Sequence, residues 1–200
     1  FAGYAFAKGH SASYAVESYQ CLFLKAYFPL EYMTATINNF GGFFKTEIYI
    51  HEARMHGAVI EAPCVNTSGE EAIIRGVRIT LGLQMIKGLE HGVRRAVLLA
   101  QAERPFLSLD DFLDRVSIGL EQAVLLARSG ALRFTAIGKK ELMWQLHFKL
   151  GREKMSRVED VLFATQRSNA TVPALEHHWL EDAYDELELF GFPLCQPFQL

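Results

Sequence analysis

The 200-residue sequence lacks the features that would place it in several common protein classes. Its three cysteines, Cys21, Cys64 and Cys195, are far from any C-x-x-C spacing, which predicts free thiols in a reducing cytoplasm and neither a zinc site nor a disulfide framework. No stretch of about 18 residues is both apolar and uncharged, and no signal peptide is recognisable, so we expect a cytoplasmic protein without a membrane partner. The sequence also lacks an initiator methionine, and we interpret it as part of a longer chain.

Positive charge is scarce as well, because the formal net charge is −3, which argues against a basic protein that coats DNA. The charged residues are segregated: residues 139–157 hold six Lys or Arg and two acids, whereas residues 176–188 hold six acids and no Lys or Arg. A solvated helix face explains each block. Any contact with DNA must therefore be local, made by a few basic side chains and backbone amides.

The sequence is rich in hydrophobic residues, 50% of the chain, arranged mostly at helical spacing, which predicts a mainly α fold with a sizeable core. The first expected part, residues 1–68, contains predicted helices at 11–27, 30–37 and 44–55 and an extended run at 58–62. The second part, residues 69–150, contains a predicted hairpin at 72–75 and 77–81 and short helices at 84–89, 90–103, 108–115, 120–128 and 138–149. The third part, residues 151–200, contains a linker over 151–175 and a helix over 179–190.

Some side chains have expected local roles. Ser108 and Asp111 form a predicted capping box at the start of a helix. Trp144 and Phe148, four residues apart on a predicted helix, are most simply core residues. The histidine pair at 177–178 points in two directions and has no third ligand at suitable spacing, so no metal site is expected there.

The first ten residues, FAGYAFAKGH, combine features suited to a nucleotide. Small residues let a backbone approach a ligand closely, and the expected helix start offers free N–H groups. Lys8 supplies a point charge suited to phosphate, His10 a ring that can donate a hydrogen bond, and Tyr4 an aromatic face for a sugar or base. The same residues also fit an ordinary N-terminal turn.

Two helical pairs suit a helix-hairpin-helix element, which binds the DNA backbone without reading sequence. In the first pair, the segment IKGL at 86–89 resembles the common form I-K-G-V-G, but Glu90 stands where a second glycine is expected and would repel a phosphate. In the second pair, a helix over 120–128 ends in the segment SGA, which a plain helix stop also explains. The predicted DNA-binding residues are Lys87, Gly88, Leu89, Gly92 and Gly130.

The opening string resembles the F-x-G-Y-x-F-x-K-x-H-x-x-x-Y segment of the bacterial C-family replicative DNA polymerases, the DNA polymerase III alpha subunits. Further segments are similar to this family in the same order: YFPLEYM at 27–33, HEARMHG at 51–57, APCVN at 62–66, LGLQMIKG at 81–88, PFLSLDDF at 105–112 and LELFGF at 187–192. The chain departs from the family pattern at Ala5, Ala7, Gly9 and Glu90.

The resemblance implies that residues 1–68 are the C-terminal part of the fingers. Residues 69–150 would be the small β patch with a tandem helix-hairpin-helix region, and residues 151–200 a linker and short helix leading toward an absent OB-fold. Tyr4, Lys8 and His10 would contact the incoming dNTP, while the hairpins grip the primer-template duplex during chromosomal replication. The full-length protein would be a DNA-directed DNA polymerase with other replisome subunits as partners. Its Mg2+ would be held by palm carboxylates outside this chain, so the fragment alone is predicted to be inactive.

Leu162 and Phe163 resemble the exposed Leu-Phe pair of the family's clamp-binding pentapeptide, although Glu159 stands where Gln is usual. The resemblance implies contact with the sliding clamp, but the pair could equally fold back onto the domain. From the residues, two other functions stay open. One is a stand-alone, sequence-independent duplex-binding helix-hairpin-helix module without enzymatic activity, and the other is a helical protein–protein adaptor.

Overall fold

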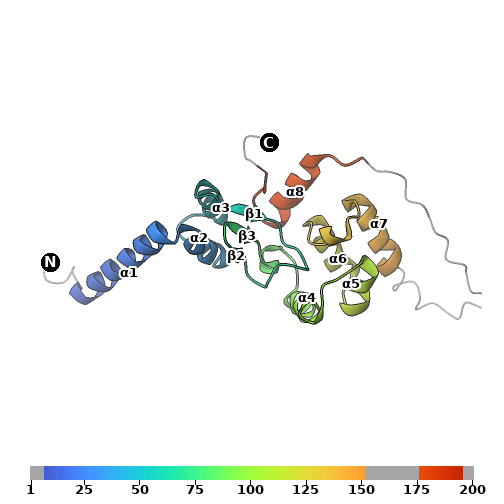
Figure 1. Cartoon of the computed structure of the whole chain (residues 1–200), viewed down its shortest axis with the longest axis horizontal. Coiled ribbons are helices and arrows are strands. Elements are labelled where there is room, and N and C mark those ends of the chain that lie inside the picture. The colour runs from blue at the N-terminus through green and yellow to red at the C-terminus, as the bar shows by residue number, and fades with distance from the viewer. Residues whose placement is uncertain (1–6, 152–175, 196–200) are drawn as a thin grey trace, which may run out of the picture. The chain divides into compact units, whose positions relative to one another are not determined.

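The computed structural model of the chain describes residues 7–151 and 176–195, so Tyr4, Leu162 and Phe163 lie outside the described residues (Figure 1). The described chain divides into two compact units. One consists of residues 7–60 with Ile74–Ile79, and the other of Glu61–Ile73 with residues 80–151 and 176–195. Helices make up most of both units, which confirms the predicted mainly α fold with a small β patch.

The first unit contains three helices, α1 (Lys8–Tyr27), α2 (Pro29–Asn38) and α3 (Thr46–Met55). Pro29 stands at the start of α2, where its fixed φ suits the first helical turn, and the residue before it leaves the helical region and ends α1. Helices α2 and α3 pack through side chains that are at most 1% exposed, namely Met33, Ile37, Ile50 and Ala53. These two helices therefore supply the core of the first unit.

Helix α1 differs from its neighbours because none of its 20 residues is buried. Large apolar side chains such as Tyr19 and Leu22 are 72% and 66% exposed. An ion pair between Lys25 Nζ and Glu52 Oε1, 2.6 Å apart, ties α1 to α3, and this hydrogen bond raises the pKa of Lys25. The N-terminal turns of α1 thus carry their side chains into solvent.

A small sheet contains β1 (Val59–Glu61), β2 (Ile73–Arg75) and β3 (Arg78–Thr80) in the order β1-β3-β2. Strands β2 and β3 form the predicted hairpin, which turns at Gly76 with a φ of +62°. This left-handed conformation strains any residue with a Cβ, which explains the glycine between the two strands. After β3 the Leu81 N–H donates to the Glu61 carbonyl at 3.0 Å, at the entry to the second unit.

The second unit contains η1 (Leu83–Met85), α4 (His91–Glu103), α5 (Leu109–Arg115), α6 (Leu120–Arg128), η2 (Arg133–Thr135), α7 (Lys139–Leu150) and α8 (Trp179–Leu189). Its core includes fully buried side chains from most of these elements, such as Ile86, Phe112, Leu126, Leu132 and Leu146. The boundaries of α4 to α8 lie within one or two residues of the predicted ones. No helix in the described part of the chain combines the length and apolar character needed to cross a membrane.

The predicted cap of α5 is confirmed, because Ser108 Oγ accepts a hydrogen bond from the Asp111 N–H at 3.1 Å. The carboxylate of Asp111 does not return to Ser108, as it would in a complete capping box. It accepts from the Leu107 N–H at 3.0 Å and from the guanidinium of Arg104, and the Arg104 hydrogen bond lowers the pKa of Asp111. The cap therefore also fixes the approach of the chain to α5.

Two local expectations are wrong. The predicted helix at 84–89 is a single 3-10 turn, because the chain becomes extended at Ile86, with ψ of 106°, and then turns at Gly88. Trp144 and Phe148 are not core residues: they are 48% and 43% exposed, with their rings stacked at a centroid distance of 5.8 Å. The face of α7 that packs into the core is the one carrying Leu142 and Leu146.

Candidate nucleic-acid interface

The first hairpin consists of η1, the turn 86–89 and helix α4. Two apolar side chains anchor the turn, since Ile86 is 1% and Leu89 4% exposed, whereas Lys87 and Gly88 between them are exposed. Gly88 has a φ of +80°, which only glycine adopts without strain. The turn therefore presents the Lys87 side chain and Gly88 to solvent, while the Lys87 N–H donates to the Leu189 carbonyl at 2.9 Å.

Gln122 of α6 holds this turn from behind, a role that the sequence did not reveal. Its Nε2 donates to the Gly88 carbonyl at 3.0 Å, and its Oε1 accepts from the Glu90 N–H at 2.8 Å. The two bonds fix the backbone on both sides of Leu89. No local pattern could identify Gln122, because it follows the turn by more than thirty residues.

The start of α4 points its free N–H groups to solvent. Glu90 is the N-cap and its side chain makes no capping bond. The first helical residues, His91 and Gly92, are exposed, and no heavy atom lies within 4 Å of the position that a Gly92 Cβ would take. Helix starts carry a partial positive charge from such N–H groups, which favours anions, although the Glu90 carboxylate opposes it here. The candidate phosphate site is thus sterically open and electrostatically mixed.

The second hairpin consists of α6, the turn 129–132 and the elements that follow. Helix α6 ends in a Schellman motif, in which Gly130, with a φ of +72°, donates to the Ala127 carbonyl and Ala131 donates to the Leu126 carbonyl. The Ala131 carbonyl accepts from the Val65 N–H at 3.0 Å, and Ala131 is fully buried. Gly130 therefore serves the turn itself, which packs against the segment 62–65.

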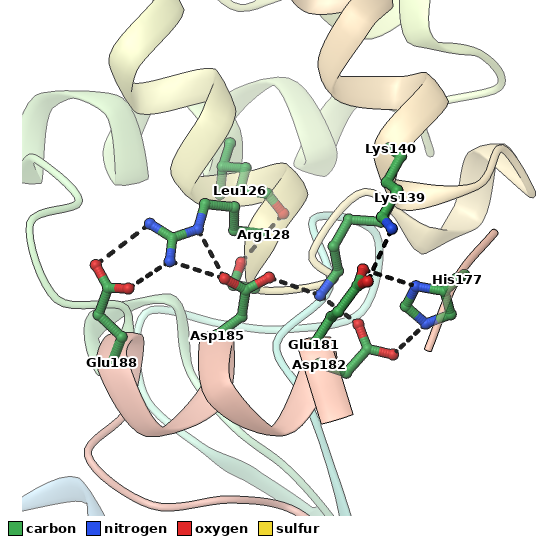
Figure 2. A network of polar contacts seen from close by, with 10 residues as sticks. Leu126, Arg128, Lys139, Lys140, His177, Glu181, Asp182, Asp185 and Glu188 are labelled. Carbon is green, nitrogen blue, oxygen red and sulfur yellow. Dashed lines mark hydrogen bonds and ion pairs between the residues drawn. The ribbon is translucent and has the colours of Figure 1, made fainter. Parts of the chain in front are cut away.

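Basic side chains at the end of α6 and the start of α7 pair with acids of α8 (Figure 2). Asp185 lies between two of them: its carboxylate is 2.7 Å from the Arg128 guanidinium and 3.0 Å from Lys139 Nζ. Glu188 also binds Arg128, and Asp182 also binds Lys139. The Glu188 and Asp185 hydrogen bonds raise the pKa of Arg128, while Arg128 lowers the pKa of Glu188.

The network continues to Lys140, whose Nζ lies 2.8 Å from Glu181 Oε1 and donates to the Glu176 carbonyl at 2.6 Å. The Lys140 hydrogen bond lowers the pKa of Glu181. His177 lies 2.8 Å from Asp182 at the edge of the same network. Because the pKa values of Glu181 and Glu188 are lowered, these two carboxylates stay charged at neutral pH, and their ion pairs are lost only as the pH falls through those lowered values.

Lys8 and His10, two of the residues predicted to contact a nucleotide, lie in the first unit. Lys8 and His10 are exposed in the first turn of α1, which has no acidic residue and no side-chain cap. They are two positions apart and so lie on different sides of the helix, and the His10 ring packs edge-on against Tyr14 with centroids 4.4 Å apart. Their contact with a nucleotide stays a prediction.

Within 7–151 and 176–195, no three His, Cys, Asp or Glu side chains are grouped so that they could hold a metal ion. Four acids of α8, Glu181, Asp182, Asp185 and Glu188, are paired with cations.

Comparison with known proteins agrees with the hairpin geometry. The model of a family described as "Helix-hairpin-helix motif" matches residues 57–142, which include both hairpin turns. The chain is 33% identical over 146 residues to the error-prone DNA polymerase of Corynebacterium glutamicum, an alignment that covers 72% of this chain and 14% of that protein. It is 30% identical over 196 residues to error-prone DNA polymerase 1 of Agrobacterium fabrum, with 88% of this chain and 17% of that protein covered.

A DNA polymerase III relative is more similar over a shorter stretch. The DNA polymerase III subunit alpha of Thermus aquaticus is 39% identical over 119 residues, covering 58% of this chain and 10% of that protein. The chain therefore spans only a small part of the length of the relatives it matches, 14% of the Corynebacterium protein. The matched motif, the two hairpins and these relatives show that the chain belongs to the bacterial C-family DNA polymerases, in which it corresponds to the helix-hairpin-helix region.

Proposed function

We propose that this chain is the part of a DNA-directed DNA polymerase that holds the primer-template duplex by its backbone. The observation that carries the proposal is the exposed turn at Lys87 and Gly88, anchored by buried neighbours and followed directly by the open N-terminus of α4. Backbone N–H groups and a single lysine can bind phosphates but cannot distinguish bases, so binding would be independent of sequence. The polymerase relatives favour this function over a stand-alone binding module.

Duplex binding in the full-length protein tests this proposal. A Lys87→Gln variant should bind two duplexes of unrelated sequence equally weakly. The slope of its log affinity against log salt concentration should be shallower than that of the wild type by about one, the value for one lost phosphate contact. Glu90→Gln should instead strengthen binding a few-fold, because it removes a carboxylate beside the proposed phosphate site. Fluorescence anisotropy between about 50 and 200 mM salt measures both effects.

Glu103→Gln is the matched control, since it makes the same charge change at the opposite end of α4, about 20 Å away along the helix. Its duplex affinity should stay within twofold of the wild type. If Lys87→Gln changes neither the affinity nor the salt dependence, the first hairpin is not the phosphate site.

A second contact of the same enzyme is proposed at the start of α1. Lys8 would bind the triphosphate of the incoming dNTP, with His10 and Tyr4 against its sugar or base. Cations in the first turn of a helix oppose the helix dipole, and α1 has no acid there to offset them. An anionic ligand would remove this unfavourable interaction, which supports a role in binding phosphate.

Nucleotidyl transfer by two Mg2+ ions requires a set of carboxylates that holds the two metals about 4 Å apart, and the described residues contain no such set. The proposed contribution of this chain is therefore binding and positioning, with the metal ligands elsewhere in the polymerase. Duplex, dNTP and other replisome subunits would be partners of the whole enzyme.

Leu162 and Phe163, which lie outside the described residues, are proposed to dock on the sliding clamp. An exposed Leu-Phe pair suits an apolar pocket, because binding would remove the large apolar area of both side chains from water. Replacing both residues by Ala should abolish clamp-stimulated synthesis while leaving synthesis without the clamp unchanged. Unchanged processivity would exclude this contact.

A further inference from the structure

The two ends of α8 are held by different forces. Its C-terminal end is anchored by apolar side chains that are at most 5% exposed, Leu189, Phe190 and Phe192. The preceding turns pair their carboxylates with cations of α6 and α7 and bury Ala183, which is 3% exposed, while their aromatic residues Trp179 and Tyr184 are 45% and 68% exposed. The acidic part of α8 is therefore fixed largely by charge, at the end away from its apolar anchor.

The cations under α8 belong to the second hairpin. Lys139 and Lys140 are the first two residues of α7, whose N-cap, Gly138, makes no side-chain capping bond. Arg128 ends α6 on the other side of the turn. Cations at the end of α6 and at the start of α7 would suit a duplex backbone if nothing covered them.

The acids of α8 reverse the charge of this surface. Four acids of α8, Glu181, Asp182, Asp185 and Glu188, pair with three cations, so these paired groups carry a net charge of −1 (four negative charges against three positive). Figure 2 shows the carboxylates of Glu181, Asp185 and Glu188 directed at these cations from one side of α8. A phosphate that approaches the second hairpin in this state meets net negative charge and is repelled.

We propose that α8 is an autoinhibitory cover: its carboxylates occupy Arg128, Lys139 and Lys140, and the phosphates of duplex DNA compete with them for these cations. Glu181 and Glu188 are 42% and 65% exposed, and ion pairs exposed to this degree are weak and screened by salt. A polyanion that offers several phosphates can therefore displace them. The inference rests on the proposed duplex binding. The second hairpin would bind duplex DNA only when α8 is displaced, whereas the turn at Lys87 would be available at all times.

A cover variant of the full-length protein, with Glu181→Gln, Asp185→Asn and Glu188→Gln, tests this mechanism. It should bind duplex DNA about tenfold more tightly than the wild type at moderate salt, with a steeper salt dependence, because up to three cations become available to phosphates. The matched control makes the same charge change on exposed acids of the same unit, Glu71→Gln, Glu103→Gln and Asp114→Asn, and should gain less than about threefold. Circular dichroism verifies that both variants fold. If the cover variant does not fold, Asp185→Asn alone replaces it, with a smaller gain expected.

The source of the gain is identified by removing the cations as well. Arg128→Gln, Lys139→Gln and Lys140→Gln should lower the duplex affinity of the wild type by no more than about threefold, the effect of net charge alone, because α8 occupies these residues, but should abolish the gain in the cover variant. A gain that persists without the cations, or one no larger than the control gives, overturns the autoinhibitory cover. A wild type that fails to bind duplex overturns the proposed function itself, so the two failures are distinguishable.

Discussion

Replacing Gly82 by Ala is expected to destabilise the second unit by about 3 kcal/mol, the upper range for forcing an extra group into a packed site. A Cβ at Gly82 would lie 2.6 Å from the Cα of Glu71 and would also collide with the backbone of Glu70. Neither backbone can retreat easily, because Leu83 and Gln84 donate hydrogen bonds to the Gly69 and Glu70 carbonyls, both at 3.0 Å. The clash therefore breaks the contact that starts the first hairpin.

Urea unfolding followed by circular dichroism measures this loss, and Gly92→Ala is the control. Gly92 stands in the first turn of α4 with open space around its Cβ position, so alanine should leave the midpoint unchanged or raise it slightly, as expected from its higher helix propensity. Equal midpoints for Gly82→Ala and the wild type would show that the segment 69–71 moves away freely. The hairpin start would then be less rigid than the described packing indicates.

Local signals in the sequence were sufficient for most of the secondary structure. Pro29 divides α1 from α2, Gly76 marks the β-hairpin turn and Ser108 caps α5, because each of these residues acts through its own backbone or that of its immediate neighbours. The exposed turn at Lys87 and Gly88 was found for the same reason. A glycine with positive φ between two buried apolar residues leaves a pattern within four positions.

Contacts between distant residues left no such pattern. Gln122 braces the first hairpin across a long stretch of sequence, and the pairing of Asp185 with Arg128 and Lys139 joins elements on either side of residues 152–175. Both charge blocks were visible in the sequence, but each is explained equally well by a solvated helix face, and nothing local indicates that they face each other. The prediction that Trp144 and Phe148 are core residues was wrong for a related reason. Four-residue spacing shows that two side chains share a helix face but does not show which face is buried.

The nucleotide assignment predicts a large kinetic effect at a residue that contributes nothing to packing. In the full-length polymerase, Lys8→Ala should lower kcat/KM for the incoming dNTP about tenfold to a hundredfold, the value expected for a lost hydrogen bond to a charged group. Lys8 is exposed in the first turn of α1 and has no described acidic partner there, so its removal should not lower stability. Steady-state synthesis on a primed template measures the effect, and duplex affinity, measured separately, should stay within twofold of the wild type.

Lys45→Ala is the matched control, because Lys45 is also an exposed lysine of the first unit, at the N-cap of α3, and is not assigned to the nucleotide. General loss of positive charge would lower kcat/KM for both variants alike, through weaker attraction of the anionic dNTP, and this shared part should fade as salt rises. A direct contact with the triphosphate is expected for Lys8 alone and should persist at higher salt, because a bound pair is screened less than a distant charge. If KM and rate are unchanged in Lys8→Ala while duplex binding is intact, the first turn of α1 is an ordinary helix start, and the triphosphate is bound by residues elsewhere in the enzyme.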